Sequence, residues 1–238
     1  MAVPTFTISC ISKHTIARSV VAFTFSKPEG FAFKAGQFVL FDVPLIENPE
    51  DIQTRALSIA SAPQENELLF VAKMKDGGRI SRWIEEVLDV GTVATIKGPF
   101  GNFKINTETS HEYAFIATST GVAPFRSMIL EALEQGITSR MDLIFGVRSE
   151  EDLFWKEECE KLAQDHQNVF VHFALSSPSG EWTGHRGRVQ TLVPLIIRNF
   201  LQRSVYVCGS PEMTKELKQL CLDEWKVEKK DLHVEGYI

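Results

Sequence analysis

The sequence predicts two domains, an N-terminal six-stranded antiparallel β-barrel and then an α/β domain with a five-stranded parallel sheet. One observation is the length of 238 residues, which exceeds a single domain of about 100–150 residues and falls short of three. Another is the apolar content of 44%, which suffices for sizeable cores. The third is a change of hydrophobic period across a polar stretch near residues 104–112. We therefore expect the domains to be residues 1–108 and 109–238.

The first half is typical of β-structure. Apolar and polar residues alternate in short segments, as in half-buried strands, and glycine and proline separate these segments, as in the turns of a small barrel. Ile80, Trp83 and Ile84 instead follow helical spacing, which predicts a helix over residues 80–88. The expected strands are residues 3–13, 20–25, 37–43, 55–60, 68–74 and 92–97.

The second half alternates apolar strands with helical segments, which is the pattern of a parallel sheet covered on both faces. In such a sheet, ligands bind beyond the carboxyl ends of the strands, so binding residues are expected where a strand gives way to a helix. The expected strands are residues 113–118, 141–147, 169–174, 204–208 and 232–237. The expected helices are residues 122–133, 150–163, 189–199 and 211–225.

The composition excludes several classes of protein. A net charge of −6, from 25 basic and 31 acidic residues, is unlike the basic footprint of a nucleic-acid binder. No apolar run approaches the roughly 20 residues of a membrane span, and no export signal is visible. The cysteines at positions 10, 159, 208 and 221 have neither zinc nor iron–sulfur spacing. We therefore expect a cytoplasmic protein with free thiols and no bound metal.

Two segments of the first half suit phosphate groups. In the segment 55–58, Arg-Ala-Leu-Ser, the guanidinium can clamp a phosphate and the serine can hydrogen-bond a ring nitrogen. In the segment 75–81, Lys-Asp-Gly-Gly-Arg-Ile-Ser, a glycine pair leads into a helix whose free N–H groups favour an anion. Each segment also has a purely structural explanation. The first is explained by an ordinary barrel strand with a surface arginine, and the second by a plain turn between a strand and a helix.

Two strand ends of the second half suit a nucleotide. Residues 117–126, Ala-Thr-Ser-Thr-Gly-Val-Ala-Pro-Phe-Arg, follow a buried strand and open a helix. Gly121 allows the backbone to approach a ligand, and Pro124 fits an early helical position. Cys208 ends a later strand, so we expect it at the same sheet edge. The segment lacks the three-glycine fingerprint of common dinucleotide folds, and a lone cysteine is more often a small buried apolar group.

Taken in order, these motifs resemble the ferredoxin–NADP reductase superfamily, and the resemblance covers roughly residues 5–238. It implies a flavin-binding barrel followed by a nucleotide-binding α/β domain, with FAD and NADH or NADPH as cofactors. The motifs are Arg-x-x-Ser at 55–58, Gly-Gly-x-x-Ser at 77–81, Gly-Pro-Phe-Gly at 98–101, Thr-Gly-Val-Ala-Pro-Phe-Arg at 120–126 and Cys-Gly-Ser-Pro-Glu-Met at 208–213.

The resemblance also implies a role for each matched residue. Arg55 resembles the residue that holds the flavin phosphate, and Ser58 resembles the hydrogen-bond partner near flavin N5. The residues expected to bind FAD are Arg55, Ala56, Leu57, Ser58, Gly78, Arg79, Ile80 and Ser81. Those expected to bind the nicotinamide nucleotide are Thr120, Gly121, Pro124, Cys208, Gly209 and Met213. The expected catalytic residues are Ser58, Cys208, Glu235 and Tyr237.

Three positions depart from the family pattern. Leu57 replaces the usual Tyr or Phe, which would stack on the flavin ring. Ser119 stands where relatives usually have glycine, and Ile238 follows Tyr237, so that the aromatic residue is not the last.

The choice of nucleotide is open at this point. Residues 174–187 resemble a segment common in NADH-using relatives, which favours NADH. Arg186 and Arg188 lie in or next to this segment, and a cation there would offset the 2′-phosphate of NADPH.

We expect the enzyme to pass a hydride from NAD(P)H to FAD and then electrons to a separate, small acidic carrier of the ferredoxin or flavodoxin type. No cysteine cluster can hold an iron–sulfur centre, and the basic stretch 73–82 suits an acidic partner. Two alternatives stay open: a free flavin reductase, in which Leu57 holds flavin loosely, and a catalytically inactive nucleotide-sensing module. The glycine-pair turn suits a pyrophosphate and favours FAD over FMN.

Overall fold

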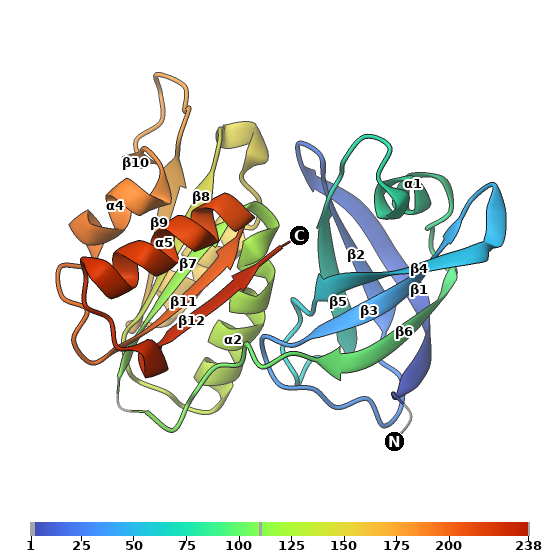
Figure 1. Ribbon diagram of the computed structural model, residues 1–238, viewed down its shortest axis with the longest axis horizontal. Coiled ribbons are helices and arrows are strands. Elements are labelled where there is room, and N and C mark those ends of the chain that lie inside the picture. The colour runs from blue at the N-terminus through green and yellow to red at the C-terminus, as the bar shows by residue number, and fades with distance from the viewer. Residues whose placement is uncertain (1–2, 110, 238) are drawn as a thin grey trace. The chain divides into compact units, whose positions relative to one another are not determined.

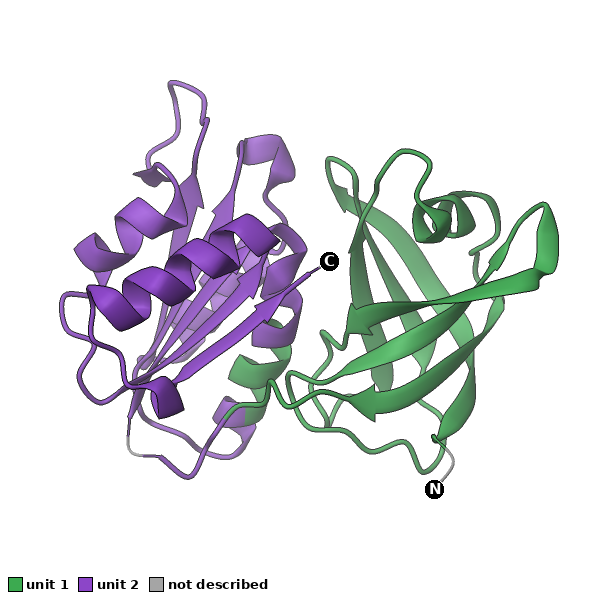
Figure 2. Cartoon of the chain, viewed as in Figure 1, with its two compact units in different colours: residues 1–105, 126–131 green, residues 106–125, 132–238 purple. Residues whose placement is uncertain are grey.

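The computed structural model describes residues 3–109 and 111–237, which form two compact units (Figures 1 and 2). Unit 1 comprises the chain up to residue 105 together with residues 126–131, and unit 2 comprises residues 106–125 and the chain from residue 132 onward. Each unit has its own sheet and its own buried apolar cluster. Within the described residues, every helix is too short or too polar to traverse a lipid bilayer.

Unit 1 contains the six-stranded antiparallel sheet that the alternating pattern predicts, in the order β4-β3-β6-β1-β2-β5. Just beyond β4, the N–H of Ala60 donates to the carbonyl of Leu69 in β5 at 2.8 Å. This bond joins the two edge strands and closes the sheet on itself. The strands are β1 (Thr5–Ala17), β2 (Val20–Ser26), β3 (Phe38–Leu45), β4 (Asn48–Ser58), β5 (Glu67–Lys73) and β6 (Val93–Phe100).

Phenylalanines from three strands fill the interior of unit 1. Phe23, Phe25, Phe41 and Phe70 are fully buried, and their ring centroids lie 4.9–6.3 Å apart. Burial of one such ring stabilises the fold by about 1.5–3 kcal/mol. The ring centroid of Trp83 in α1 (Arg79–Glu86) lies 6.5 Å from that of Phe41, so the helix is anchored to the barrel. This anchor also fixes the position of the helix N-terminus.

Unit 2 contains a parallel sheet of six strands, in the order β10-β9-β8-β7-β11-β12, whereas the sequence predicted five. The additional strand is β10 (His185–Arg186), which pairs with β9 and is too short to leave a hydrophobic pattern. The other strands are β7 (Glu112–Thr118), β8 (Met141–Val147), β9 (Val169–Leu175), β11 (Arg203–Gly209) and β12 (Leu232–Gly236). The helices are α2 (Ala123–Glu134), α3 (Lys156–Asp165), α4 (Val189–Ile196) and α5 (Pro211–Asp223), with 3-10 turns η1 (Ser119–Val122), η2 (Glu150–Asp152) and η3 (Lys229–Asp231).

Three helices of unit 2 are shorter than the sequence periodicity predicts, and one of them, α5, ends at Asp223 and not at residue 225. The expected helix 150–163 divides into η2 and α3, because Trp155 between them has a left-handed backbone with φ of 54°. The expected helix 189–199 ends at Ile196, since the backbone is extended at Ile197. Pro194 lies in the last turn of this helix, and a proline inside a helix removes one backbone donor.

The parallel sheet is buried on both faces, as the apolar strands predict. Helices α4 and α5 cover one face (Figure 1), where Ile116 of β7 shares a buried cluster with Val193 of α4 and Leu217 of α5. On the opposite face, Phe115 packs against Phe125 of α2 with ring centroids 5.3 Å apart. Ligands therefore reach this sheet at its strand ends.

Candidate functional site

Arg55 and Leu57 lie on the same face of β4, near its carboxyl end. The Arg55 guanidinium donates to the carbonyl of Thr54 at 2.8 Å and to the side-chain oxygen of Gln53 at 2.9 Å. Leu57 packs partly against the barrel core. The guanidinium is thus held near the surface on a rigid strand, where it can bind a phosphate, while Leu57 offers a ligand only part of its side chain.

Ala56 and Ser58 face the other side of β4, because side chains alternate along a strand. Ala56 is exposed, whereas Ser58 is buried at the end of the strand. The four predicted residues therefore lie within one strand end but are divided between its two faces. A ligand that contacts both Arg55 and Ser58 must reach around this end.

The glycine pair leads into α1 and leaves its N-terminus open. Gly78 occupies the N-cap position, no acidic residue stands in the first turn, and among the described residues no side chain caps this end. Ser81 Oγ accepts the backbone N–H of Lys75 at 2.8 Å, which holds the turn against the helix. The first-turn amides, those of Arg79 and Ile80 among them, therefore present partial positive charge that favours an anion.

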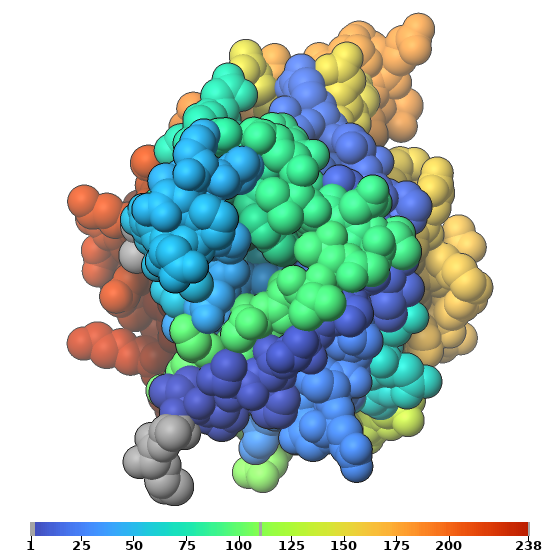
Figure 3. All heavy atoms as spheres, turned by 90° about the vertical axis from the view of Figure 1, so that its right-hand side faces the viewer, coloured from blue at the N-terminus to red at the C-terminus, as the bar shows by residue number. Residues whose placement is uncertain are grey.

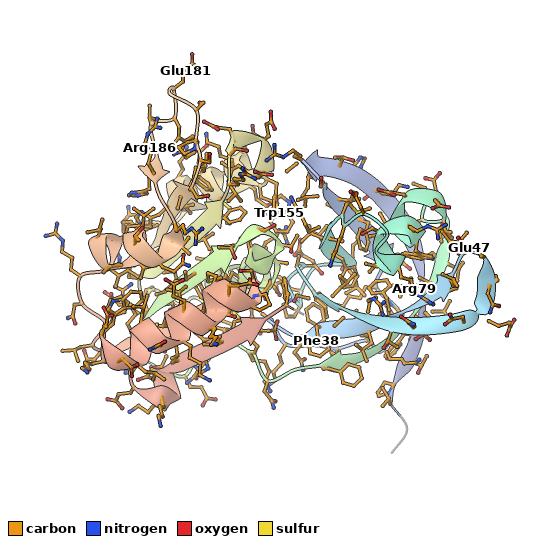
Figure 4. The ribbon with its side chains drawn as sticks, turned by 45° about the horizontal axis from the view of Figure 1, so that its top comes forward. Phe38, Glu47, Arg79, Trp155, Glu181 and Arg186 are labelled. Carbon is orange, nitrogen blue, oxygen red and sulfur yellow. The ribbon has the colours of Figure 1, made fainter. Side chains whose placement is uncertain are left out.

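The basic stretch 73–82 is partly neutralised in the structure. The guanidinium of Arg79 donates to both carboxylate oxygens of Asp51, at 3.2 and 3.0 Å, and to its carbonyl at 2.7 Å. Arg82 pairs with Glu47 at 2.6 Å. Glu47 lies in the turn between β3 and β4, and Asp51 lies in the first half of β4. This β3–β4 hairpin lies against α1 (Figures 3 and 4). Arg79, predicted to bind the cofactor, thus fastens this hairpin to the helix.

In unit 2, the predicted residues of β7 and β11 meet at the carboxyl edge of the sheet. Cys208 pairs with Ala117 in parallel register. A Cβ on Gly121 would lie 2.4 Å from the carbonyl oxygen of Cys208, and a Cβ on Gly209 would lie 2.2 Å from Thr118 Oγ1. Both contacts are too short for any residue but glycine, so the two turns form one close-packed cradle of backbone.

The remaining predicted residues of this edge shape the helix starts. Thr120 is buried in η1, and Pro124 is buried in the first turn of α2. Met213 is buried in the core, and its N–H donates to Ser210 Oγ, the N-cap of α5, at 3.3 Å. Ser119 has a left-handed backbone with φ of 51°, a conformation that glycine adopts without strain. This explains physically why a glycine suits that position.

Strand β12 brings Glu235 and Tyr237 to the same sheet edge. Glu235 pairs with Cys208 in register. The Tyr237 hydroxyl donates to the carbonyl of Thr120 at 3.3 Å, and its N–H donates to the carbonyl of Gly209 at 3.0 Å. Burial raises the pKa of the Cys208 thiol well above its usual range, the Glu235 carboxylate raises it further, and a side-chain hydrogen bond with Tyr237 lowers it. Cys208 is therefore a neutral thiol at physiological pH.

A cavity of about 470 Å³ opens beyond the carboxyl ends of β7, β8, β9 and β11. This is the place where open α/β sheets bind nucleotides. It is lined by Thr118, Ser119, Gly146, Val147, Arg148, Ala174, Ser176, Gly187, Arg188, Val189, Gln190, Ser210, Glu212, Met213 and Glu216.

Arg148 lines the cavity although the sequence motifs do not indicate it. It directly follows β8, so the rule that ligands bind beyond strand ends identifies it once that strand is located. Arg188 also lines the cavity, at the N-cap of α4. The Arg186 guanidinium instead donates to the carbonyls of Gly180 and Trp182, at 3.0 and 2.6 Å. Of the two arginines considered for the 2′-phosphate, Arg188 is therefore the one that lines the cavity.

Known proteins match both units. The model of the oxidoreductase FAD-binding domain matches residues 7–105, and that of the oxidoreductase NAD-binding domain matches residues 115–219. The chain is 34% identical to ferredoxin–NADP reductase B of Sorangium cellulosum over 223 residues, which is 90% of each chain. It is 30% identical to the ferredoxin–NAD(P)(+) reductase component of the naphthalene 1,2-dioxygenase system of Pseudomonas putida, over 81% of this chain and 56% of that protein.

Solved structures share the fold. A ferredoxin–NADP+ reductase from Neisseria gonorrhoeae with bound FAD and NADP has a TM-score of 0.84 at 20% identity, covering 98% of each chain. The fold and the two matched domains define a flavoprotein oxidoreductase that uses FAD and a nicotinamide nucleotide. The chain belongs to the ferredoxin–NADP reductase family, and it is an NAD(P)H-dependent flavin oxidoreductase.

Proposed function

We propose that this enzyme passes electrons from NAD(P)H through bound FAD to a separate ferredoxin- or flavodoxin-type carrier. The Sorangium reductase supports this proposal most directly, because the match spans 90% of both chains. The chain spans between 51% and 61% of the length of seven further curated relatives. We assign residues 1–108 to the flavin domain and residues 109–238 to the nucleotide domain.

In the flavin domain, we assign the phosphates of FAD to the Arg55 guanidinium and to the turn at Gly78, where the first-turn amides of Arg79, Ile80 and Ser81 are the donors. The open N-terminus of this helix supports an anion there. We assign Ser58 to hydrogen bonding at the flavin ring, with Ala56 and Leu57 in contact with it. FAD, when bound, accepts a hydride and releases electrons, which no side chain of the protein can do.

In the nucleotide domain, we assign the cavity beyond the strand ends to the nicotinamide nucleotide. The close-packed backbone at Gly121 and Gly209 supports the approach of phosphate and ribose groups to the sheet edge. Cys208 and Glu235 orient the nicotinamide ring, and the neutral thiol of Cys208 places no charge beside it. Tyr237, bonded to Thr120 across this edge, is the group that must move for the ring to enter.

The cavity adds a reason for NADPH binding, while the preference for NADH stays a prediction from the sequence. Arg148 and Arg188 both line the cavity. A 2′-phosphate would therefore find two cationic partners. We propose that the enzyme accepts NADPH through these arginines.

The observation that carries the proposal is the cavity beside the Cys208–Gly121 cradle, in a chain whose first half matches an FAD-binding domain. The test begins with the visible spectrum and the released cofactor of the purified protein. NADH and NADPH are then titrated without oxygen, and a ferredoxin or flavodoxin is supplied as acceptor. We expect FAD bands that bleach with either nucleotide and catalytic reduction of the carrier. Flavin bands that neither nucleotide bleaches would overturn the proposal.

The second candidate is a free flavin reductase, in which flavin is substrate and not a resident group. Leu57 favours it, because this side chain packs partly against the barrel core and covers less of a flavin ring than an aromatic would. Gel filtration distinguishes the two: a yellow protein fraction supports the carrier reductase, whereas a colourless folded protein supports the flavin reductase.

We also propose that the protein works in the cytoplasm. The support is that all four cysteines, Cys10, Cys159, Cys208 and Cys221, are buried and free. Free thiols are the usual state of cysteines in a reducing compartment. Localisation of the tagged chain in its host tests this proposal.

A further inference from the structure

The carboxylate of Glu150 joins two loops that both supply residues to the nucleotide cavity. We propose that Glu150 is a positioning residue that holds these loops in place and thereby raises the affinity for the adenosine end of the nicotinamide nucleotide. This inference rests on the proposed function, since it assigns the cavity to that nucleotide.

Glu150 begins η2, two residues after the cavity residue Arg148. Its Oε1 accepts the backbone N–H of Ser179 at 2.9 Å and the Ser179 hydroxyl at 2.6 Å, and its Oε2 accepts the same N–H at 3.2 Å. The hydrogen bond from the Ser179 side chain is the largest cause of the lowered pKa of Glu150, and the charge of Arg186 contributes a little. The contact is therefore a charge-assisted one at neutral pH.

Ser179 belongs to the segment 176–187, which follows β9, contains the short strand β10 and leads towards α4. The segment reaches the cavity at both ends. Ser176 lines the cavity at one end, and Gly187 lines it at the other, just before Arg188. The middle of the segment is mostly exposed, so burial of apolar surface contributes little to its position. Figure 4 shows Glu181 at the tip of this loop and Arg186 closer to its base.

The ends and the middle of this segment are held by different contacts. The N–H of Ser177 donates to the carbonyl of Arg148 at 2.7 Å, and the N–H of Gly187 donates to the carbonyl of Leu175 at 2.8 Å. These two backbone bonds fix the ends. Glu150 connects the middle of the segment 176–187 to the loop that follows β8. The loop after β8 therefore both supplies Arg148 to the cavity and restrains the segment 176–187.

Loss of this contact has a specific consequence for binding. A loop that moves freely must be ordered when a ligand binds, and the entropy of ordering is subtracted from the affinity. The nicotinamide end lies at the Cys208–Gly121 cradle, whose contacts do not involve Glu150. We therefore expect the adenosine end to bind more weakly while the rate of hydride transfer at saturation is unchanged.

The experiment compares E150A and S179A with the control E181A in the holoenzyme. Glu181 is an exposed carboxylate of the same loop, so E181A makes the same charge change outside the contact. We expect E150A to raise KM for the preferred nucleotide roughly three- to tenfold, with kcat within about twofold. S179A, which keeps the backbone N–H bonds to Glu150, and E150Q should both lie between E150A and the wild type. A fragment without nicotinamide, ADP or 2′,5′-ADP, should bind more weakly by the same factor in calorimetry.

The outcomes separate the inference from the function on which it rests. An unchanged KM and unchanged fragment affinity in both E150A and S179A overturn the positioning role. The same result follows if E181A raises KM as much as E150A, because the effect is then one of charge alone. S179A provides the measurement if E150A does not fold. A wild-type holoenzyme that binds neither fragment and oxidises neither nucleotide overturns the proposed function itself.

Discussion

Arg79 and Asp51 form a bidentate ion pair that fastens the β3–β4 hairpin to the first turn of α1. The shorter distance, between Arg79 Nη2 and Asp51 Oδ2, is 3.0 Å. The Arg79 side chain is 12% exposed and that of Asp51 is 41% exposed. The arginine is thus packed in place, while its partner lies closer to solvent. Because we propose that the amides of this turn bind the FAD diphosphate, we expect the ion pair to affect FAD binding through the position of the helix.

We expect D51N to weaken FAD binding roughly two- to fivefold, the range of a partly exposed ion pair, without changing KM for the nicotinamide nucleotide. The Kd of FAD for the stripped protein, measured by flavin fluorescence, checks this. E50Q is the control, because Glu50 is an exposed residue of the same hairpin. Equal FAD affinity in D51N and E50Q would show that the pair does not hold the turn.

The left-handed backbone of Ser119 predicts a stabilising substitution. Its φ of 51° is strained for a residue with a Cβ and free for glycine. We expect S119G to increase the free energy of unfolding by about 0.5–1 kcal/mol, as measured by urea denaturation. A decrease in the free energy of unfolding would mean that a contact of the Ser119 side chain stabilises the fold by more than its backbone strain destabilises it.

The buried thiol of Cys208 predicts a dependence of stability on alkaline pH. The folded pKa is raised by burial and by Glu235, so above roughly pH 9 the unfolded thiol loses its proton while the folded one keeps it. The unfolded state then binds fewer protons, and stability falls as the pH rises. We expect C208A to reduce this slope by about 1.4 kcal/mol per pH unit, measured by denaturation at pH 9–10.5. C221A is a positive control outside the proposed site: burial raises the pKa of Cys221 to about 12, so C221A should reduce the slope as well. Equal slopes in wild type and C208A would contradict the buried neutral thiol.

Hydrophobic periodicity predicted most strands of both sheets, because these strands carry a continuous or alternating apolar pattern. Strand β4 begins at Asn48 and not at residue 55, as expected, because the residues before Arg55 are mostly exposed. The exceptions have local causes. Strand β10 consists of His185 and Arg186, two polar residues whose pairing with β9 is decided by the loop that delivers them. The break before α3 depends on the left-handed backbone of Trp155. A tryptophan rarely adopts this conformation, so the sequence did not predict the break.

In unit 2, the strand-end rule indicated Thr120, Gly121 and Cys208, whereas Glu235 and Tyr237 were expected from the family resemblance. The structure brings all five residues to one edge of the sheet. Ion-pair partners could not be predicted from local sequence patterns. Nothing in the sequence pairs Arg79 with a residue 28 positions away, and so the basic stretch appeared more positive than it is. Local patterns reveal elements and their ends, whereas side-chain partners depend on tertiary contacts.

A buried charge cluster lies at the opposite ends of the same strands. Arg203 pairs with Asp142 at 2.6 Å and with Glu112, and Asp142 is 1% exposed. Burial alone would raise the pKa of Asp142, but hydrogen bonds with His172, Arg140 and Arg203 hold it well below its usual range.

We expect R203M to lower the free energy of unfolding by about 3 kcal/mol, because it leaves a buried carboxylate with fewer partners. Chemical denaturation measures this loss. R140M should cost less, since the Arg140 side chain is 38% exposed. The folded fraction of R203M should keep the wild-type KM for nucleotide; a loss equal to that of R140M would contradict the role of burial.

Arg188 provides the sharpest test of nucleotide choice. Arg188 lines the cavity, and a charge-assisted bond to a phosphate contributes about 1.5–3 kcal/mol. We therefore expect R188Q to raise KM for NADPH about 10- to 100-fold while KM for NADH changes less than twofold, in steady-state assays with a ferricyanide acceptor. R186Q is the control, because Arg186 bonds the carbonyls of its own loop; it should affect both nucleotides alike. If R188Q raises both KM values equally, Arg188 contacts the diphosphate common to the two nucleotides. If neither changes, the 2′-phosphate lies elsewhere and the preference for NADH regains its support.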